Sequence, residues 1–386
     1  MDLSGTWNYP TSYHFGAGRI KSLPEQARAM GMRRPLLVTD PGLAALEIVS
    51  DMVESLSVAG LVVSVFSDIK ANPTGTSVRD GIHAYREGDH DGAIIVGGGS
   101  ALDAGKAIAL LARQSLDVWE LVDEGDNWLR VREDLVPPII AVPTTAGTGS
   151  EVGRASVITH EGEQAKKILF HPKMLPCLVI ADPELTVGLP SGLTAATGMD
   201  ALSHNLEAFC APGYHPMARG IAVEGMRLIK KWLPAAYANG TDIEARSHML
   251  VASSMGATAF QRGLGAMHAL AHPLGALYDA HHGTLNAIVM PYVLIANQQA
   301  IEDDITELTH TLGMQKKGFA AFLDWVLELR EGLSLPHTLS EVGIGDEQAE
   351  AIGDMAVCDP TAATNPISHD AEAYAEILRR SVNGVL

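Results

Sequence analysis

The spacing of hydrophobic residues along the chain changes near residue 190. Before that point, short apolar runs rich in Val, Ile and Leu alternate with amphipathic stretches; the runs are PLLVTD, LVVSVF, GAIIVGGG, PIIAVPTT and CLVIAD (residues 35–40, 61–66, 92–99, 138–145 and 177–182). Continuous apolar strands separated by helices are typical of a mostly parallel sheet that is covered on both faces. We therefore predict an α/β domain with a mostly parallel sheet over residues 1–189.

After DPELTVGLPSGL the spacing becomes helical, and the sequence is rich in Ala, Leu, Met and His. We predict an all-helical domain over residues 190–386. Its helices should break at residues 212–213, 239–240, 283 and 335–336, where Gly or Pro occurs. The junction between the domains is short, so we expect them to pack closely with a cleft between them.

Composition argues against several classes of protein. The 386 residues are 47% apolar and 19% charged, which indicates a globular chain long enough for two domains. No apolar run approaches the roughly 18 residues of a membrane span, and the start, MDLSGTWNYP, lacks the features of a signal peptide. Cys177, Cys210 and Cys358 are odd in number and far apart, which favours a reducing, cytoplasmic compartment. The net charge of −19 argues against nucleic-acid and membrane partners.

The helical half carries carboxylate and imidazole side chains at helical spacing. Asp200 and His204 stand four apart in TGMDALSHNLEAF, as do His268 and His272 in GLGAMHALAHPLGALYDAHHG, which also contains His282. Residues four apart share one helix face, so the first pair can bind one ion, and His268 can do so with a ligand just beyond its helix. A single histidine is more often a packing residue. Among Ala, Leu and Gly, however, an uncompensated Asp or His is costly. The group therefore predicts a site for Fe²⁺, Zn²⁺ or another first-row divalent metal.

Two loops of the α/β half favour a nucleotide ligand. GGGSALDAGKA (residues 97–107) follows an apolar strand and opens a helix, so its glycines and helix-start N–H groups suit a pyrophosphate. The loop is neither G-x-G-x-x-G nor a P-loop, which would need Ser or Thr at Ala107, and a plain strand–helix turn is the alternative. PTTAGTGSE (residues 143–151) offers hydroxyl groups to phosphate, ribose or nicotinamide, or to its own backbone.

Asp40 ends the first strong strand. A carboxylate there can accept hydrogen bonds from the adenosine ribose and would repel a 2′-phosphate, which predicts NAD rather than NADP as the cofactor. The alternative is a helix N-cap. A nucleotide domain joined to a metal domain predicts metal-assisted hydride transfer between an alcohol and NAD⁺.

Nearly the whole chain resembles the iron-containing (group III) alcohol dehydrogenases. The resemblance rests, in this order, on YHFGAGRIKSL, the NPT of residues 72–74, GGGSALDAGKA, PTTAGTGSE, ADPELT, TGMDALSHNLEAF, GLGAMHALAHPLGALYDAHHG and the NP of residues 365–366. It implies the dehydroquinate synthase-like fold, with an NAD-binding α/β domain and a helical metal-binding domain. It also implies hydride transfer between NAD(H) and a short-chain alcohol, diol or aldehyde, by a homo-oligomer (a dimer or larger).

Matched residue by residue, the resemblance places the metal ligands at Asp200, His204, His268 and His282. The resemblance places His272 near the metal and the nicotinamide without making it a ligand. We therefore predict that His272 relays a proton and that Asp200 and His268 are catalytic together with it. The alternative for His272 is packing against Pro273. The cofactor positions are Asp40, Asn72, Gly98, Gly99, Ser100, Asp103, Thr144, Thr145 and Lys167.

Three positions depart from the family pattern. Gly105 replaces the commoner Ala, His281 adds an imidazole beside His282, and Ile367 stands where many members have Arg. We favour His282 over His281 as the ligand, because adjacent residues point in different directions. Because the Arg after Asn365–Pro366 is absent, the substrate of the relatives cannot be transferred to this chain.

Two other function classes are alternatives to the dehydrogenase. A lyase or hydrolase like dehydroquinate synthase, with bound NAD, should need a cluster of Lys and Arg beside the histidines, in which the helical half is poor. A non-catalytic nucleotide sensor would not need a complete set of metal ligands.

Overall fold

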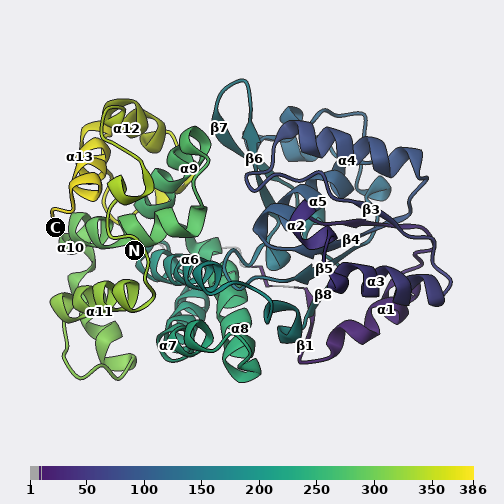
Figure 1. Cartoon of the computed structure of the whole chain (residues 1–386). Coiled ribbons are helices and arrows are strands. Elements are labelled where there is room, and N and C mark those ends of the chain that lie inside the picture. The colour runs from purple at the N-terminus through teal and green to yellow at the C-terminus, as the bar shows by residue number, and fades with distance from the viewer. Residues whose placement is uncertain (1–7, 10) are drawn as a thin grey trace. The chain divides into compact units, whose positions relative to one another are not determined.

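The computed structural model describes residues 8–9 and 11–386, which group into two compact units (Figure 1). The α/β unit comprises Tyr9–Thr145 and Gly149–Gly188, and the helical unit comprises Asn8, Ala146–Thr148 and Leu189–Leu386. Three residues from the middle of PTTAGTGSE thus group with the helices. The interpretation of MDLSGTWNYP falls almost entirely outside the described residues.

A six-stranded parallel sheet forms the centre of the α/β unit, in the order β1-β8-β5-β4-β2-β3. Its strands are β1 (Ser12–Phe15), β2 (Pro35–Val38), β3 (Ser64–Phe66), β4 (Gly92–Gly97), β5 (Ile139–Pro143) and β8 (Leu178–Ala181), and every neighbouring pair is parallel. All residues of β2, β4, β5 and β8 are buried, as expected for a sheet that is covered on both faces. The predicted α/β class is confirmed.

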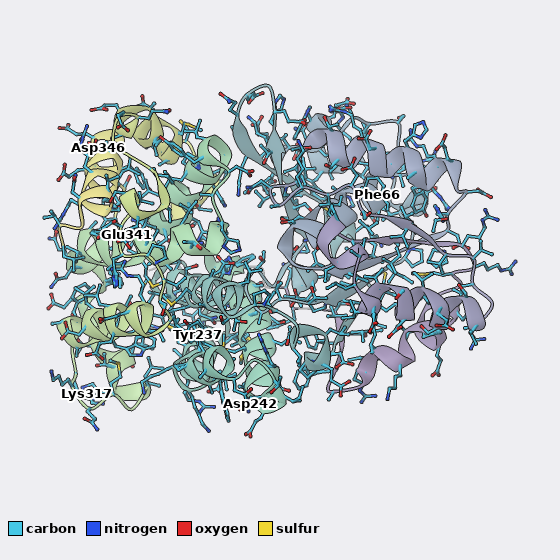
Figure 2. The ribbon with its side chains drawn as sticks, in the orientation of Figure 1. Phe66, Tyr237, Asp242, Lys317, Glu341 and Asp346 are labelled. Atoms are coloured by element: carbon cyan, nitrogen blue, oxygen red, sulfur yellow. The ribbon has the colours of Figure 1, made fainter. Side chains whose placement is uncertain are left out.

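Successive residues of the central strands enter two separate cores. Ile94 and Val96 face the core that contains α1 (Leu23–Ala29) and α3 (Glu47–Val58), whereas Ala93 and Ile95 face the core that contains α4 (Gly75–Glu87) and α5 (Gly99–Leu111). Figure 1 shows these helix pairs on opposite sides of the sheet, and Phe66, labelled in Figure 2, packs against the second core.

Gly105 has a packing role in this arrangement. A Cβ at this position would lie 2.6 Å from Cγ2 of Ile95 on β4, closer than real contacts allow. The departure from the family's commoner Ala therefore accompanies a close approach of α5 to the sheet.

Three strands of the α/β unit were missed by the sequence analysis. They are β1 and the antiparallel hairpin of β6 (Ala155–His160) and β7 (Ala165–Phe170). Their residues are mostly half-buried, so they lack the continuous apolar run that identifies the central strands. The remaining elements are α2 (Pro41–Ala44) and the short 3₁₀ helices Arg19–Ser22, Val118–Leu121, Asn127–Arg130, Glu133–Leu135, Ser150–Val152, Pro172–Met174 and Pro183–Thr186.

The helical unit contains eight α-helices in its described part and no strand. They are α6 (Ser191–Cys210), α7 (Pro216–Ala238), α8 (Ile243–Ala259), α9 (Ala266–Tyr278), α10 (His282–Thr311), α11 (Phe319–Gly332), α12 (Ala349–Val357) and α13 (Ala371–Asn383), with 3₁₀ turns at Phe260–Arg262, Ser340–Val342 and Pro360–Thr364. Helix α6 packs against α7, α8 and α10 and is buried over most of its length. Asp242 caps α8 by accepting a hydrogen bond from the Ala245 N–H at 3.0 Å (Figure 2).

Most predicted helix breaks fall between helices, but Gly283 does not. It lies in the first turn of α10, which begins at His282, and a Cβ there would meet the Ala196 carbonyl oxygen at 2.3 Å. Gly283 therefore permits the close packing of α10 on α6 rather than breaking a helix. Among the described helices, none is both long and apolar enough to cross a membrane.

Candidate metal centre and nucleotide loops

Three helices of the helical unit each carry two side chains, four residues apart, toward one buried group. The pairs are Asp200 and His204 on α6, His268 and His272 on α9, and His282 and Asn286 on α10. Because four residues make about one helical turn, each pair stands on a single helix face. In the fold, these three helix faces meet at one place.

The predicted metal ligands lie close together. One ligand atom each from Asp200, His204 and His268 can be chosen so that all lie within 4.8 Å of one another. His282 Nε2 is 3.7 Å from Asp200 Oδ1, and the His204 and His268 rings stack with centroids 4.6 Å apart. The first three residues are buried and His282 is half-buried. The helical unit therefore gathers a carboxylate and three imidazoles, the donor set that suits Fe²⁺ or Zn²⁺.

Hydrogen bonds determine which ring nitrogen carries the proton in two of the imidazoles. Glu207 Oε2 lies 2.6 Å from His268 Nδ1, and the Gly147 carbonyl lies 3.3 Å from His204 Nδ1. Since both partners are acceptors, the neutral form of each ring carries its proton on Nδ1 and keeps the lone pair of Nε2 for an ion. A carboxylate behind a metal-binding histidine is a common arrangement that orients the ring. Glu207 was not predicted from the sequence, although it stands three residues after His204 on the same helix.

Burial and charge act differently on the two rings. Burial lowers the pKa of His204 to about 4, against the opposing effect of Asp200, so this imidazole is neutral near pH 7. For His268, burial would also lower the pKa, but the carboxylate of Glu207 and those around it outweigh burial and raise the pKa. The carboxylates near His268 therefore favour a positive charge on this ring.

Asn286 is a further residue of the centre that the sequence analysis missed. Its Nδ2 lies 2.9 Å from Asp200 Oδ1, 3.3 Å from His268 Nε2 and 3.2 Å from His282 Nε2. Its Oδ1 is buried without a hydrogen-bond partner. A buried polar atom of this kind calls for a ligand or an ion nearby, so the residues present fit a divalent metal.

His272 belongs to a separate pair with Asp359. His272 Nδ1 lies 2.7 Å from Asp359 Oδ2, and the other carboxylate oxygen accepts hydrogen bonds from Thr361 N and Oγ1 at 2.9 and 2.6 Å. Burial raises the pKa of Asp359, but His272 and Thr361 more than offset this and lower it to about 2. The carboxylate is thus ionised and fixes the ring, which stacks on His282 with centroids 5.5 Å apart.

His281 has a different environment from His282. It is exposed and caps α10, with its Nδ1 accepting from the Thr284 N–H at 3.4 Å. This geometry agrees with our preference for His282 as the ligand, which stays a prediction.

The glycine-rich loop gathers cofactor candidates at the carboxyl ends of the strands. Gly98 is the N-cap of α5 and offers no side-chain cap, and a Cβ there would lie 3.1 Å from Thr145 Oγ1. Thr144 N donates to the Gly97 carbonyl at 3.0 Å. Gly99 begins α5, and Ser100 Oγ donates to the Ala71 carbonyl next to Asn72, which brings that loop alongside. Open helix-start N–H groups beside small residues fit a pyrophosphate.

The two carboxylate oxygens of Asp40 have different surroundings. Its Oδ1 accepts from the Leu43 N–H at 3.0 Å and caps α2. Its Oδ2 lies 3.6 Å from the position of a Cβ on Gly97, so it faces the glycine-rich loop. One oxygen therefore caps a helix while the other points toward the candidate nucleotide site.

Asp103 and Lys167 are engaged with other side chains. Asp103 accepts from Ser150 Oγ and from the Val157 N–H at 2.9 Å, and pairs with the buried Lys106 at 3.4 Å. These contacts tie α5 to the loop after β5. Lys167 lies on β7 and forms an ion pair with Glu163 at 2.7 Å. Direct contacts of Asp103 and Lys167 with a cofactor stay predictions.

Comparison with known proteins identifies the family. The iron-containing alcohol dehydrogenase model matches residues 10–183, and the C-terminal model of the same family matches residues 194–382. The chain is 39% identical to 4-hydroxybutyrate dehydrogenase of Cupriavidus necator, over 97% of this chain and 99% of that protein. It is 33% identical to NAD-dependent methanol dehydrogenase of Bacillus methanolicus, over 97% and 98% of the two chains.

The fold has close counterparts among solved structures. A crystal structure of 1,3-propanediol oxidoreductase superposes with a TM-score of 0.92 at 33% identity, over 98% of this chain and all of that one. The relatives named above are alcohol or diol oxidoreductases, one of them NAD-dependent by name, so the comparisons and not the fold alone define the class of this protein. This chain belongs to the iron-containing alcohol dehydrogenase family.

Proposed function

We propose that this protein is an NAD-dependent, metal-dependent alcohol dehydrogenase or aldehyde reductase. Its substrates would be short-chain alcohols, diols or the matching aldehydes. The observation that carries the proposal is the convergence of Asp200, His204, His268 and His282 in a chain of the iron-containing alcohol dehydrogenase family.

These four side chains would hold the metal. When bound, a divalent ion would act as a Lewis acid that polarises an alcohol or aldehyde oxygen. The family favours Fe²⁺, and the imidazole–carboxylate set also accepts Zn²⁺. Glu207 supports this role because it keeps the proton of His268 on Nδ1, away from the ion.

His272 would handle the substrate proton. Asp359 accepts from its Nδ1, which leaves Nε2 as the nitrogen that takes or gives a proton. The ionised Asp359 would also stabilise the ring when it is charged, as a carboxylate does behind a catalytic histidine. This assigns a hydrogen-bonded partner to the relay that the sequence suggested.

The glycine-rich loop and its neighbours would bind NAD. Gly98, Gly99 and Ser100 would receive the pyrophosphate at the start of α5, with Thr144 and Thr145 beside it. Asp40 would accept hydrogen bonds from the adenosine ribose through Oδ2. Asn72, Asp103 and Lys167 complete the proposed cofactor set, with Asp103 acting chiefly through the loop that it holds.

The relatives support small substrates. Those named above act on 4-hydroxybutyrate, methanol and 1,3-propanediol, and we propose an alcohol or aldehyde of this size range. We further propose a homo-oligomer, a dimer or larger, and a cytoplasmic location. The family resemblance supports the first, and the three free cysteines support the second.

A substrate panel tests this function. Metal-loaded protein is mixed with NAD⁺ or NADP⁺ and methanol, 1,3-propanediol or 4-hydroxybutyrate, and NADH formation is followed by absorbance. We expect NAD⁺ reduction by at least one alcohol, with loss of metal and turnover but not of NAD binding in His268→Ala. Product formation without net NAD⁺ reduction would instead favour the lyase alternative, and cofactor binding without any turnover would favour a sensor.

A further inference from the structure

The C-terminal Asn365–Pro366 motif reaches the helix that carries two histidines of the metal centre. Helix α9 begins at Ala266 after Gly265, which has no side chain to cap it. The first N–H groups of a helix need acceptors from elsewhere when the N-cap provides none. Two other segments of the helical unit supply them.

One acceptor is Asn365 and the other is Glu207. Asn365 Oδ1 accepts from the Ala266 N–H at 3.0 Å, and Glu207 Oε1 accepts from the Met267 N–H at 2.7 Å. A Cβ at Gly265 would lie 2.7 Å from Asn365 Oδ1. Glycine is therefore needed at this position, because any side chain would displace the capping amide.

Asn365 is itself held rigidly. Its amide exchanges two hydrogen bonds with the amide of Asn297 on α10, at 2.9 and 2.8 Å, and its Nδ2 also donates to the Ile367 carbonyl at 2.7 Å. Both asparagines are buried, where an amide with all its partners fixes a neighbour more firmly than an exposed one. Ile367 contributes a backbone carbonyl, so this contact does not depend on the Arg that many relatives have there.

The short segment from Asp359 to Asn365 contacts α9 at two places. The turn Pro360–Thr364 starts at Asp359, which binds His272, and ends at Asn365, which caps Ala266. His268 lies between these two attachment points on α9. The position of its ring is thus set by both ends of one turn from the C-terminal part of the chain.

We propose that Asn365 is a positioning residue for the metal-binding His268. It acts through the backbone at the start of α9 and touches neither metal nor substrate. The inference rests on the proposed function for the role of His268 as a ligand. Loss of the cap lets the first turn of α9 shift, which moves His268 relative to Asp200 and His204 and weakens the metal site.

The test compares two asparagines of one hydrogen-bonded pair. Asn365→Ala removes the cap, whereas Asn297→Ala breaks the same amide pair and leaves the cap in place. The dissociation constant for Zn²⁺ is measured by competition with a chromophoric chelator, the visible spectrum of the Co²⁺-loaded protein reports ligand geometry, and calorimetry gives the affinity for NAD. Melting temperatures show how far each variant is destabilised.

We expect Asn365→Ala to weaken Zn²⁺ binding about tenfold or more, and to change the Co²⁺ spectrum, with NAD affinity within about twofold of wild type. Asn297→Ala should lower the melting temperature and weaken Zn²⁺ binding less than Asn365→Ala, because it loosens the capping amide without removing it. Asn365→Asp retains an acceptor for the Ala266 N–H and should restore the spectrum. If Asn365→Ala does not fold, Asn365→Ser takes its place in the same comparison.

Two results would overturn the proposal. One is an unchanged Zn²⁺ affinity and Co²⁺ spectrum in Asn365→Ala, and the other is an equal loss of Zn²⁺ affinity in the two alanine variants, which would mean that the pair only stabilises the fold. A wild-type protein that binds no metal would instead contradict the proposed function.

Discussion

Exchanging Glu207 for Gln isolates the role of one carboxylate behind the metal centre. Glu207 accepts two hydrogen bonds, from the Met267 N–H at 2.7 Å and from His268 Nδ1 at 2.6 Å. Glutamine has nearly the same shape but only one acceptor oxygen. It can therefore serve one of the two donors, and its NH₂ group must face the other.

Each orientation of the glutamine has a cost that can be given a size. If its oxygen faces Met267, its NH₂ meets His268 Nδ1, and the proton of the ring must move to Nε2, the nitrogen that would bind the ion. If its oxygen faces His268, a buried N–H of Met267 loses its acceptor, at a cost of about 1–3 kcal/mol. A change of 1.4 kcal/mol corresponds to about tenfold in an equilibrium constant, so we expect Glu207→Gln to weaken metal binding by about 5- to 150-fold.

The assay is chelator competition with Zn²⁺ and with Fe²⁺ under anaerobic conditions, followed by NAD⁺-dependent turnover of the same samples. Glu224→Gln is the matched control, because Glu224 lies on α7 and forms an ion pair with the nearby Arg227 at 2.6 Å. The control should bind metal like the wild type. If Glu207→Gln also binds metal and turns over like the wild type, the tautomer of His268 does not depend on Glu207 and the reasoning is refuted.

Three further predictions concern single side chains. His282→Ala should lose bound metal, whereas His281→Ala should keep it and lose only about 1 kcal/mol of stability as a helix cap; the reverse result in metal analysis would mean that the ligand was misassigned. His272→Ala and Asp359→Asn should keep the metal, lower kcat by about a hundredfold, and change the pH–rate profile, and an unaltered profile would show that the pair only packs. The wild type should use NADP about a hundredfold less efficiently than NAD, as judged by kcat/KM. Asp40→Asn keeps an acceptor for the first N–H groups of α2 but removes the negative charge, so this variant should accept NADP. Equal use of both cofactors by the wild type would exclude the ribose contact.

The sequence predicted those parts of the fold that have a strong local signal. Buried parallel strands such as β4 are continuous apolar runs, and helices such as α7 and α13 have one apolar face, so both could be identified. Most residues of the β6–β7 hairpin are half-buried, so it lacks a continuous apolar run and could not be distinguished from a loop. Gly283 was misread because its close contact with α6 is tertiary, and a glycine's local sequence does not show what packs against it.

The candidate site shows the same division. Metal ligands can be recognised from residue type and helical spacing, but their partners cannot. Asp359 is 87 residues from His272 in sequence, and Asn365 is 99 residues from Ala266. Only the fold brings such pairs together, and an Asp or Asn in a C-terminal turn carries no mark of its partner. Asn286 could have been found, since it stands four residues after His282 on one helix face.

We propose that one divalent ion, held by Asp200, His204, His268 and His282, is required for NAD-linked alcohol oxidation. The most direct measurement titrates metal-free protein with Fe²⁺ or Zn²⁺ while recording both bound metal and NAD⁺ reduction. Turnover should rise in proportion to bound metal and reach its limit at a single ion per chain, and His268→Ala should show neither. Full turnover in the metal-free protein, or metal binding and turnover by His268→Ala equal to those of the wild type, would contradict the account.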